Sequence, residues 1–430
     1  MAVAIWLIVF GGIFALGYPI AFGMIISSII YLLVSGIDLF TVMDVMVIQF
    51  ENQFVLLAVP LFIFSAKVMN ISKLTDRLFD FAGTLVGPVR GGLGHVNIVG
   101  SIIFAGMSGS ELADVAGIGT IEIKAMKDAG YDGPFSCAVT SASAVIGPII
   151  PPSIPMIIYS MLSGASVGFL FLGGIVPGLI LGGVLMLLVA ILSVKRNYPK
   201  TEWVSFREFV RIFIRSFLIL LAPVVLLGGI YGGVFTPTEA AGVISVYVLI
   251  LSLFVYRSLG LRGVYNVLIE SVLNTGFISF IVAGSFIFGY VVAREEIPAL
   301  ITKAFISLGL MSSKWMVLLS LNILFLLLGC FIDVSAILLI IVPIVLPLVK
   351  EAGIDLVHFG VVVTFNLMMA LGTPPYGQCL FITSAVSGTP LTDVIKEMLK
   401  FLVFEIIALL IITYIPETVL WIPRLAGYKG

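Results

Sequence analysis

The sequence predicts an all-α, polytopic membrane protein built as an inverted repeat with two re-entrant helical hairpins. Three observations support this fold class: an apolar composition, a duplicated pattern of helix-breaking residues, and two basic loops that agree on membrane orientation. Hydrophobic residues make up 60% of the 430 residues and charged residues only 10%, with a mean hydropathy of +1.24. Soluble domains carry about 25% charged residues, so the chain is expected to lie in a lipid bilayer.

The composition and the absent motifs also exclude several functional classes. A net charge of −1 gives no bulk attraction for nucleic acid, and we expect no nucleic-acid partner. The cysteines Cys137, Cys330 and Cys379 are scattered, which favours packing over a disulfide framework or a zinc site. The sequence has no Walker A motif and no Ser/His/Asp constellation, so we expect no enzyme, no catalytic residue and no organic cofactor. Ion coupling is then the default energy source.

Apolar segments of about 20 residues, the length of a spanning helix, indicate the membrane spans. Residues 3–34 form the first, with Pro19 as a candidate break, and no basic region precedes them as in a cleaved signal peptide. Residues 71–86 mix apolar and charged side chains at helical spacing, which predicts an amphipathic interfacial helix. The remaining expected spans are residues 54–69, 167–194, 217–233, 238–256, 276–293 and 401–422, with a charged interfacial helix at 391–400.

Residues 195–215 and 257–262 are basic, and the positive-inside rule places both on the cytoplasmic side. Four other segments interrupt the apolar sequence with glycine, proline or polar residues, which break helices or kink them. We name them the first tip (residues 105–114), the first break (147–155), the second tip (328–335) and the second break (370–377).

The two halves of the chain match at an offset of 223 residues. KDAGYD at residues 127–132 returns as KEAGID at 350–355, Pro151-Pro152 returns as Pro374-Pro375, and Gly106 returns as Gly329. If the tips belong to hairpins that do not cross, each copy has four crossings, and the extra span at residues 217–233 inverts the second copy. Such inverted repeats are the usual plan of secondary transporters, with the binding site at the paired interruptions.

Non-helical backbone at membrane depth is tolerated only where it is buried in protein or lines a cavity. Half-helix ends offer carbonyl oxygens to a hard cation and N–H groups to an anion. We therefore expect two pseudosymmetric cation sites built mostly from main-chain carbonyls. The paired positions are Ala105 with Leu328, Gly147 with Ala370, Ile150 with Thr373, and Pro152 with Pro375.

Asp333 is the most informative single residue, because an acid within an apolar run is costly and suggests function. Two compatible interpretations stay open: a cap for the helix that follows, or contact with the substrate, directly or through water. In the first tip, Ser108 and Ser110 offer hydroxyl groups, while Glu111 and Asp114 are candidates to cap the next helix.

Five motifs in order resemble the large membrane subunit of tripartite ATP-independent periplasmic (TRAP) transporters: SGSELADVAGIG, GPIIPPSIPMIIY, GVFTPTEAAG, GIDLVHFGVV and GTPPYG. The resemblance implies an elevator transporter that couples Na⁺ entry, with two or more ions, to uptake of an organic acid, a carboxylate or a sulfonate. It implies the bacterial inner membrane, a soluble periplasmic binding protein and a small four-helix membrane subunit. This chain has no room for a fused small subunit, so a separate one is expected.

The resemblance further implies a division into scaffold and transport domain. The scaffold would comprise residues 1–92, 166–312 and 390–430, with the helices at 71–86 and 263–275 as bracing arms. The transport domain would comprise residues 93–165 and 313–389.

The same resemblance implies specific ligands. The first Na⁺ site would use carbonyls around Ala105, Ser108, Gly147, Ile150 and Pro152. The second would lie around Gly329, Ile332, Ala370, Thr373 and Tyr376. Substrate contacts would fall at Ser108, Ser153 and Asp333, with Ser110 as a further hydroxyl at the tip.

Two functions other than a tripartite importer are alternatives for this chain. A stand-alone Na⁺/organic anion symporter or antiporter of the same fold would share all these motifs. A channel or a membrane enzyme would need a ring of charge or a catalytic cluster, and the sequence shows neither. The acid itself is not readable from the sequence; C4-dicarboxylates, sugar acids, keto acids and sulfonates all qualify.

Overall fold

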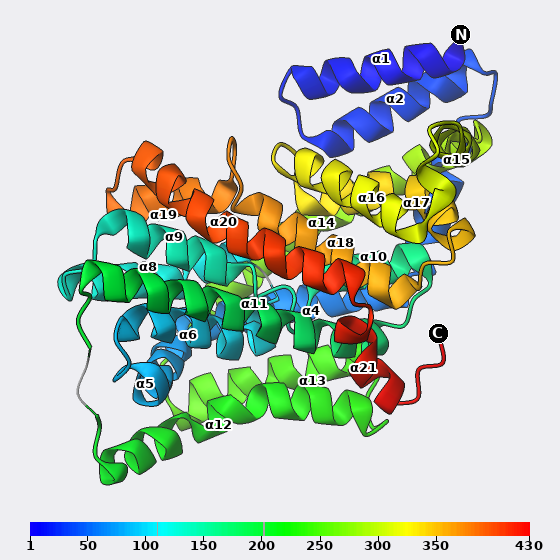
Figure 1. Ribbon diagram of the computed structural model, residues 1–430. Coiled ribbons are helices and arrows are strands. Elements are labelled where there is room, and N and C mark those ends of the chain that lie inside the picture. Colours follow the sequence, from blue (N-terminus) through cyan, green and yellow to red (C-terminus); the bar gives the residue numbers. More distant parts are fainter. Residues whose placement is uncertain (110, 201–202) are drawn as a thin grey trace.

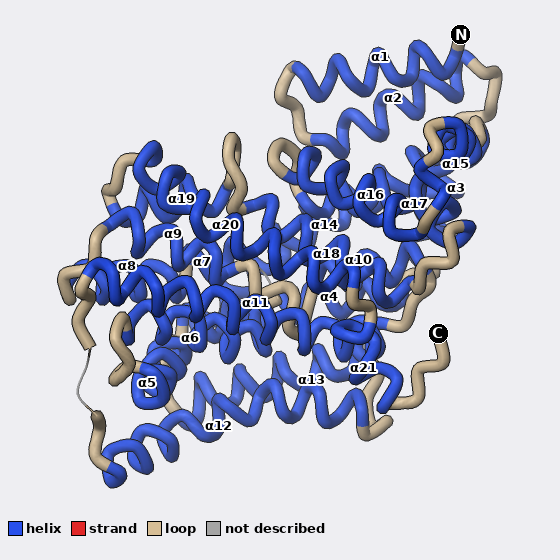
Figure 2. The backbone as a smooth tube through the Cα atoms, in the orientation of Figure 1, coloured by secondary structure: helices blue, strands red, loops and turns tan. Residues whose placement is uncertain are grey.

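A computed structural model describes residues 1–109, 111–200 and 203–430. Throughout these ranges the secondary structure is helical, without strands (Figure 2). Six described helices are long and apolar enough to cross a membrane, or seven if the bent pair α20 and α21 counts as one span. The chain is therefore a multi-pass membrane protein.

The described residues of the first half form eleven helices and one 3₁₀ turn. They are α1 (Ala2–Ala15), α2 (Ile20–Val34), α3 (Phe40–Glu51), η1 (Phe54–Leu57), α4 (Ala58–Ile71), α5 (Leu74–Val86), α6 (Gly92–Ser108), α7 (Glu111–Ala116), α8 (Ile118–Asp128), α9 (Gly133–Ala144), α10 (Ile154–Ser163) and α11 (Val167–Arg196).

The second half repeats this order with some elements fused. They are α12 (Phe206–Tyr231), α13 (Pro237–Ile250), η2 (Leu251–Val255), α14 (Leu261–Arg294), α15 (Ile297–Ser307), η3 (Leu310–Ser312), α16 (Lys314–Gly329), α17 (Val334–Glu351), α18 (Leu356–Leu371), α19 (Gln378–Ser387), α20 (Leu391–Tyr414) and α21 (Glu417–Leu425).

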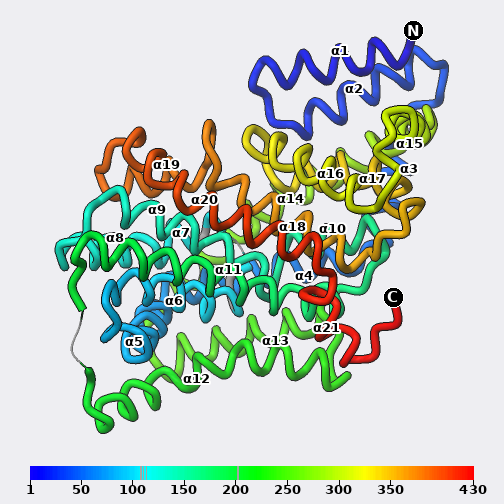
Figure 3. The backbone as a smooth tube through the Cα atoms, viewed as in Figure 1, coloured from blue at the N-terminus to red at the C-terminus, as the bar shows by residue number. Residues whose placement is uncertain are grey.

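The duplication extends beyond the motifs that revealed it. The hairpin of α1 and α2 lies at one edge of the molecule and the hairpin of α12 and α13 at the opposite edge (Figure 3). Reciprocally, α2 packs on α14 while α13 packs on α4. The short helices α5 and α15 lie toward opposite ends of the molecule (Figure 1). The peptide bonds Pro151-Pro152 and Pro374-Pro375 are both cis.

Several expected boundaries are correct. The break at Pro19 separates α1 from α2, and the amphipathic helix, the two tips and the two breaks interrupt the chain as predicted. The span expected at residues 217–233 is part of α12, which is long and apolar enough to cross a membrane. Helix α12 begins earlier than expected, at Phe206, and therefore includes the arginines of the basic segment; it packs on α13 as α1 packs on α2.

Two predictions are wrong because the expected helix breaks do not occur. The arm at residues 263–275 is the first part of the continuous helix α14, in which no proline interrupts the hydrogen-bond ladder. By position, the counterpart of α5 is α15 instead. The charged helix at 391–400 likewise continues into α20, and the bend of 55° comes later, near Pro416.

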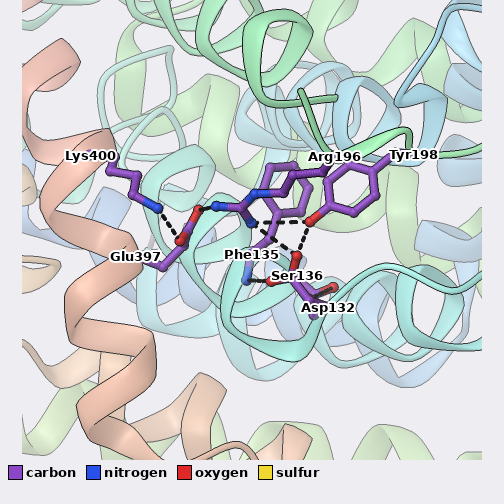
Figure 4. Close-up of polar contacts among 7 residues, drawn as sticks. All are labelled: Asp132, Phe135, Ser136, Arg196, Tyr198, Glu397 and Lys400. Carbon is purple, nitrogen blue, oxygen red and sulfur yellow. Dashed lines mark hydrogen bonds and ion pairs between the residues drawn. The ribbon is translucent and has the colours of Figure 1, made fainter. Parts of the chain in front are cut away.

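The helix before each break, α9 in the first copy and α18 in the second, begins with a capping aspartate. Asp132 caps α9 and also accepts hydrogen bonds from Arg196, the last residue of α11, and from Tyr198, which follows that helix. Arg196 in turn forms an ion pair with Glu397 of α20 (Figure 4). In the second copy Asp355 caps α18 and accepts a hydrogen bond of 2.9 Å from the Tyr428 hydroxyl.

Candidate functional site

The first tip lies directly against the first break. Gly109 ends α6 with a left-handed backbone, and a Cβ placed on it would lie 2.7 Å from the Pro152 carbonyl oxygen. A Cβ on Gly106 would lie 3.9 Å from the Pro151 oxygen and 2.7 Å from Pro223 of α12. The absence of side chains at these glycines lets the tip backbone approach the carbonyls of the double proline.

The second tip meets the second break in the same manner. A Cβ placed on Gly329 would lie 2.5 Å from the Cβ of Ala370, so the end of α16 packs tightly on the end of α18. Within the break, the Thr373 hydroxyl donates to the Met369 carbonyl at 2.8 Å, and the Thr373 carbonyl accepts from the Gly377 amide at 3.1 Å. Both expected pairings of tip and break are therefore present.

The other predicted cation ligands vary in burial. Ala105, Gly147, Ile150 and Pro152 are buried in the first half, as are Gly329, Ala370 and Thr373 in the second. Ile332 is half-buried, whereas the Tyr376 side chain is 52% exposed and its ring lies 5.7 Å from that of Phe381. Ser108 ends α6, and Ser110 lies outside the described residues.

Two predicted substrate residues begin the half-helices that follow the interruptions. The fully buried Ser153 caps α10, its hydroxyl accepting from the Met156 amide at 3.3 Å. Asp333 caps α17, its Oδ1 accepting from the Ser335 amide at 2.9 Å and the Ala336 amide at 3.4 Å. The capping role of Asp333 is confirmed, and it is compatible with a substrate contact, which stays a prediction.

Four acids on α7, α8 and α20 are buried, two of them within the first tip. Glu111 accepts a hydrogen bond of 2.9 Å from the Cys379 thiol, and a Cβ on Gly147 would lie 2.2 Å from Oδ2 of Asp114. Glu122 accepts from Asn97 at 2.7 Å, and Glu405 of α20 is fully buried. The sequence analysis missed Glu122 and Glu405, although an acid inside an apolar run is a signal that identifies Glu405.

A cavity of about 340 Å³ lies where the interruptions face the neighbouring helices α4 and α14. Leu112, Ile154, Asp333 and Ser335 form one wall, close to the first turns of α7, α10 and α17. The rest of the lining consists of Ile63, Ala66 and Lys67 from α4 and Asn274, Phe277 and Ile278 from α14. The sequence analysis did not identify Lys67 as a candidate, although a lysine inside an expected span is a signal for function.

A larger cavity, of about 610 Å³, lies between α4, α13 and α14, but its walls are almost entirely apolar. A small polar solute needs a few placed polar groups in its site. The smaller cavity supplies an acid, a lysine, an amide and a hydroxyl, so it is the better candidate for a substrate site.

Known proteins of one family resemble this chain over most of its length. The profile of the family described as "Tripartite ATP-independent periplasmic transporter, DctM component" matches residues 5–418. The chain is 40% identical to the sialic acid TRAP transporter large permease protein SiaM of Vibrio cholerae over 97% of each chain. It is 41% identical to the C4-dicarboxylate TRAP transporter large permease protein DctM of Pseudomonas aeruginosa over 88% of each chain. It is 36% identical to the sialic acid TRAP transporter permease protein SiaT of Haemophilus influenzae, over 99% of this chain and 68% of SiaT.

Proposed function

Because the chain belongs to the DctM component family of tripartite ATP-independent periplasmic transporters, we propose that it imports a small organic acid across the bacterial inner membrane by Na⁺-coupled secondary transport. The acid is a carboxylate or a sulfonate. The observation that carries the proposal is the cavity lined by the first tip, the first break, the second tip and helices α4 and α14.

Na⁺ coupling is supported by the chemistry of the breaks. At each break the helix ends and carbonyl oxygens leave the regular ladder, which is the donor set that a hard cation prefers. In the proposed sites, carbonyls around Ala105, Ser108, Gly147, Ile150 and Pro152 hold one Na⁺ as a cosubstrate. Those around Gly329, Ile332, Ala370, Thr373 and Tyr376 hold the other. Closure of each tip on its break is then coupled to ion binding.

An elevator motion is supported by the way the two copies exchange elements. Helix α10, after the first break, packs on α17 of the second copy, and α19 packs on α7 and α8 of the first. Both breaks and both tips are thereby joined in one packed unit that moves as a body. If the tips do not cross the membrane, each copy has five crossings once α1 is counted, and an odd number inverts the second copy.

Two partners complete the proposed transporter: a separate small membrane subunit and a periplasmic binding protein that delivers the acid. The proposal is supported by family membership and by the relatives named as TRAP transporter permeases.

Reconstitution into proteoliposomes tests the proposal. Radiolabelled sialic acid, succinate and isethionate serve as probes, each with an inward Na⁺ or K⁺ gradient and with or without the two partner proteins. We expect uptake of at least one probe only with Na⁺ and both partners. Uptake by the chain alone would make it a stand-alone symporter or antiporter instead.

A further inference from the structure

Lys67 brings a positive charge to the candidate substrate cavity. It lies on α4 and lines the same cavity as Asp333 and Ser335 at the beginning of α17. Its side chain is 22% exposed, so the ammonium group is neither sequestered in the core nor free in bulk solvent. Neither tip nor break contains an arginine, so an anion entering this cavity finds its direct charge partner on α4.

The remaining polar groups of the cavity are suited to orienting a ligand that Lys67 holds. Asn274 and Ser335 offer hydrogen bonds, and the N-terminal turns of α10 and α17 carry partial positive charge. Asp333 is the acid of the wall, and its Oδ1 is already engaged by two backbone amides. An acid group therefore sits best near Lys67, with hydroxyl or amide donors of the same molecule toward Asp333.

The present partner of Lys67 is Glu270 of α14, with 2.9 Å between Nζ and Oε2. Glu270 is 53% exposed and lies outside the cavity wall. Ion pairs of such exposure contribute only about 0.2–1 kcal/mol, so a ligand anion can replace the glutamate at little cost. Glu270 can then turn into solvent, which leaves the charge of Lys67 balanced before and after binding.

We propose that Lys67 binds the acid group of the transported molecule, and that this anion takes the place of the Glu270 carboxylate. The inference rests on the proposed function. Because Lys67 belongs to α4, outside the unit formed by the tips and breaks, the contact forms in the conformation observed here and is broken when that unit moves along the membrane normal. Lys67 is thus a binding residue for one side of the transport cycle.

Two substitutions separate anion binding from the structural ion pair. Lys67→Gln and Glu270→Gln both remove the pair between α4 and α14, but only the first removes the cation. KM is measured for the transported probe in the complete proteoliposome system, with Na⁺-induced thermal stabilisation as a check of folding. We expect Lys67→Gln to raise KM at least tenfold, Lys67→Arg to retain most affinity, and Glu270→Gln to leave KM unchanged or lower it.

Equal rises in KM for Lys67→Gln and Glu270→Gln would assign the pair a structural role and overturn the inference, as would an unchanged KM in Lys67→Gln. A wild-type system without Na⁺-dependent uptake of any probe would instead refute the proposed function. The two failures are therefore distinguishable in one set of measurements.

Discussion

The Cys379 thiol donates a hydrogen bond of 2.9 Å to the Glu111 carboxylate, joining residues 268 positions apart in the sequence. Cys379 lies in the first turn of α19, after the second break, and Glu111 begins α7, within the first tip. The contact therefore connects the interruption of one copy with that of the other. It is a local sign that the two candidate ion sites belong to one packed unit.

Removing this thiol should destabilise the unit. Cys379→Ala takes the donor from a fully buried carboxylate, at a cost of about 1–3 kcal/mol in unfolding free energy. Cys379→Ser keeps a donor and should lose less. Thermal unfolding in detergent measures both, with Cys330→Ala as the control for loss of a buried thiol elsewhere. Equal effects of Ala and Ser at position 379 would argue that the hydrogen bond contributes nothing.

Two substitutions can distinguish the capping role of Asp333 from its predicted contact with the substrate. Asparagine caps helices about as well as aspartate, whereas alanine loses about 0.5–2 kcal/mol. We expect Asp333→Asn to keep the wild-type melting temperature and Na⁺-dependent stabilisation but to lose uptake, and Asp333→Ala to lose uptake and some stability. Normal uptake by Asp333→Asn would reduce this residue to a cap.

The contact between the second tip and the second break should not tolerate a methyl group. In Gly329→Ala the new Cβ would meet the Cβ of Ala370 at 2.5 Å, and such overpacking costs about 1–3 kcal/mol. We expect a higher Na⁺ concentration for half-maximal uptake. Gly183→Ala in α11, where nothing lies within 4 Å of a Cβ, is the matched control and should behave as wild type. An unchanged Na⁺ dependence of uptake in Gly329→Ala would show that this contact does not contribute to ion binding.

The features predicted correctly from sequence are those that depend on local chemistry. Proline pairs and glycines combined with polar residues interrupt helices through local chemistry, so both breaks, both tips and the cap at Asp333 could be anticipated. The duplicated motifs at constant offset also identified the repeat.

The errors came from interactions between distant segments. The charged start of α20 is expected from sequence to be a separate interfacial helix. In the fold, Glu397 is paired with Arg196 of α11 at 2.5 Å and with Lys400 of α20 at 2.6 Å. These two partners neutralise the glutamate, so the charged residues can belong to one continuous helix. Lys67 gains a candidate role only because the fold places it in the lining of the same cavity as Asp333. Such neighbours cannot be read from one sequence segment at a time.

In the proposed mechanism, each pair of tip and break holds one Na⁺ whose binding drives transport. The most direct measurement is the initial uptake rate in proteoliposomes as a function of external Na⁺, with the binding protein and the small subunit present. Two coupled sites predict no uptake in K⁺ alone and a cooperative Na⁺ dependence with a Hill coefficient above one. Equal uptake in Na⁺ and K⁺ would contradict the account.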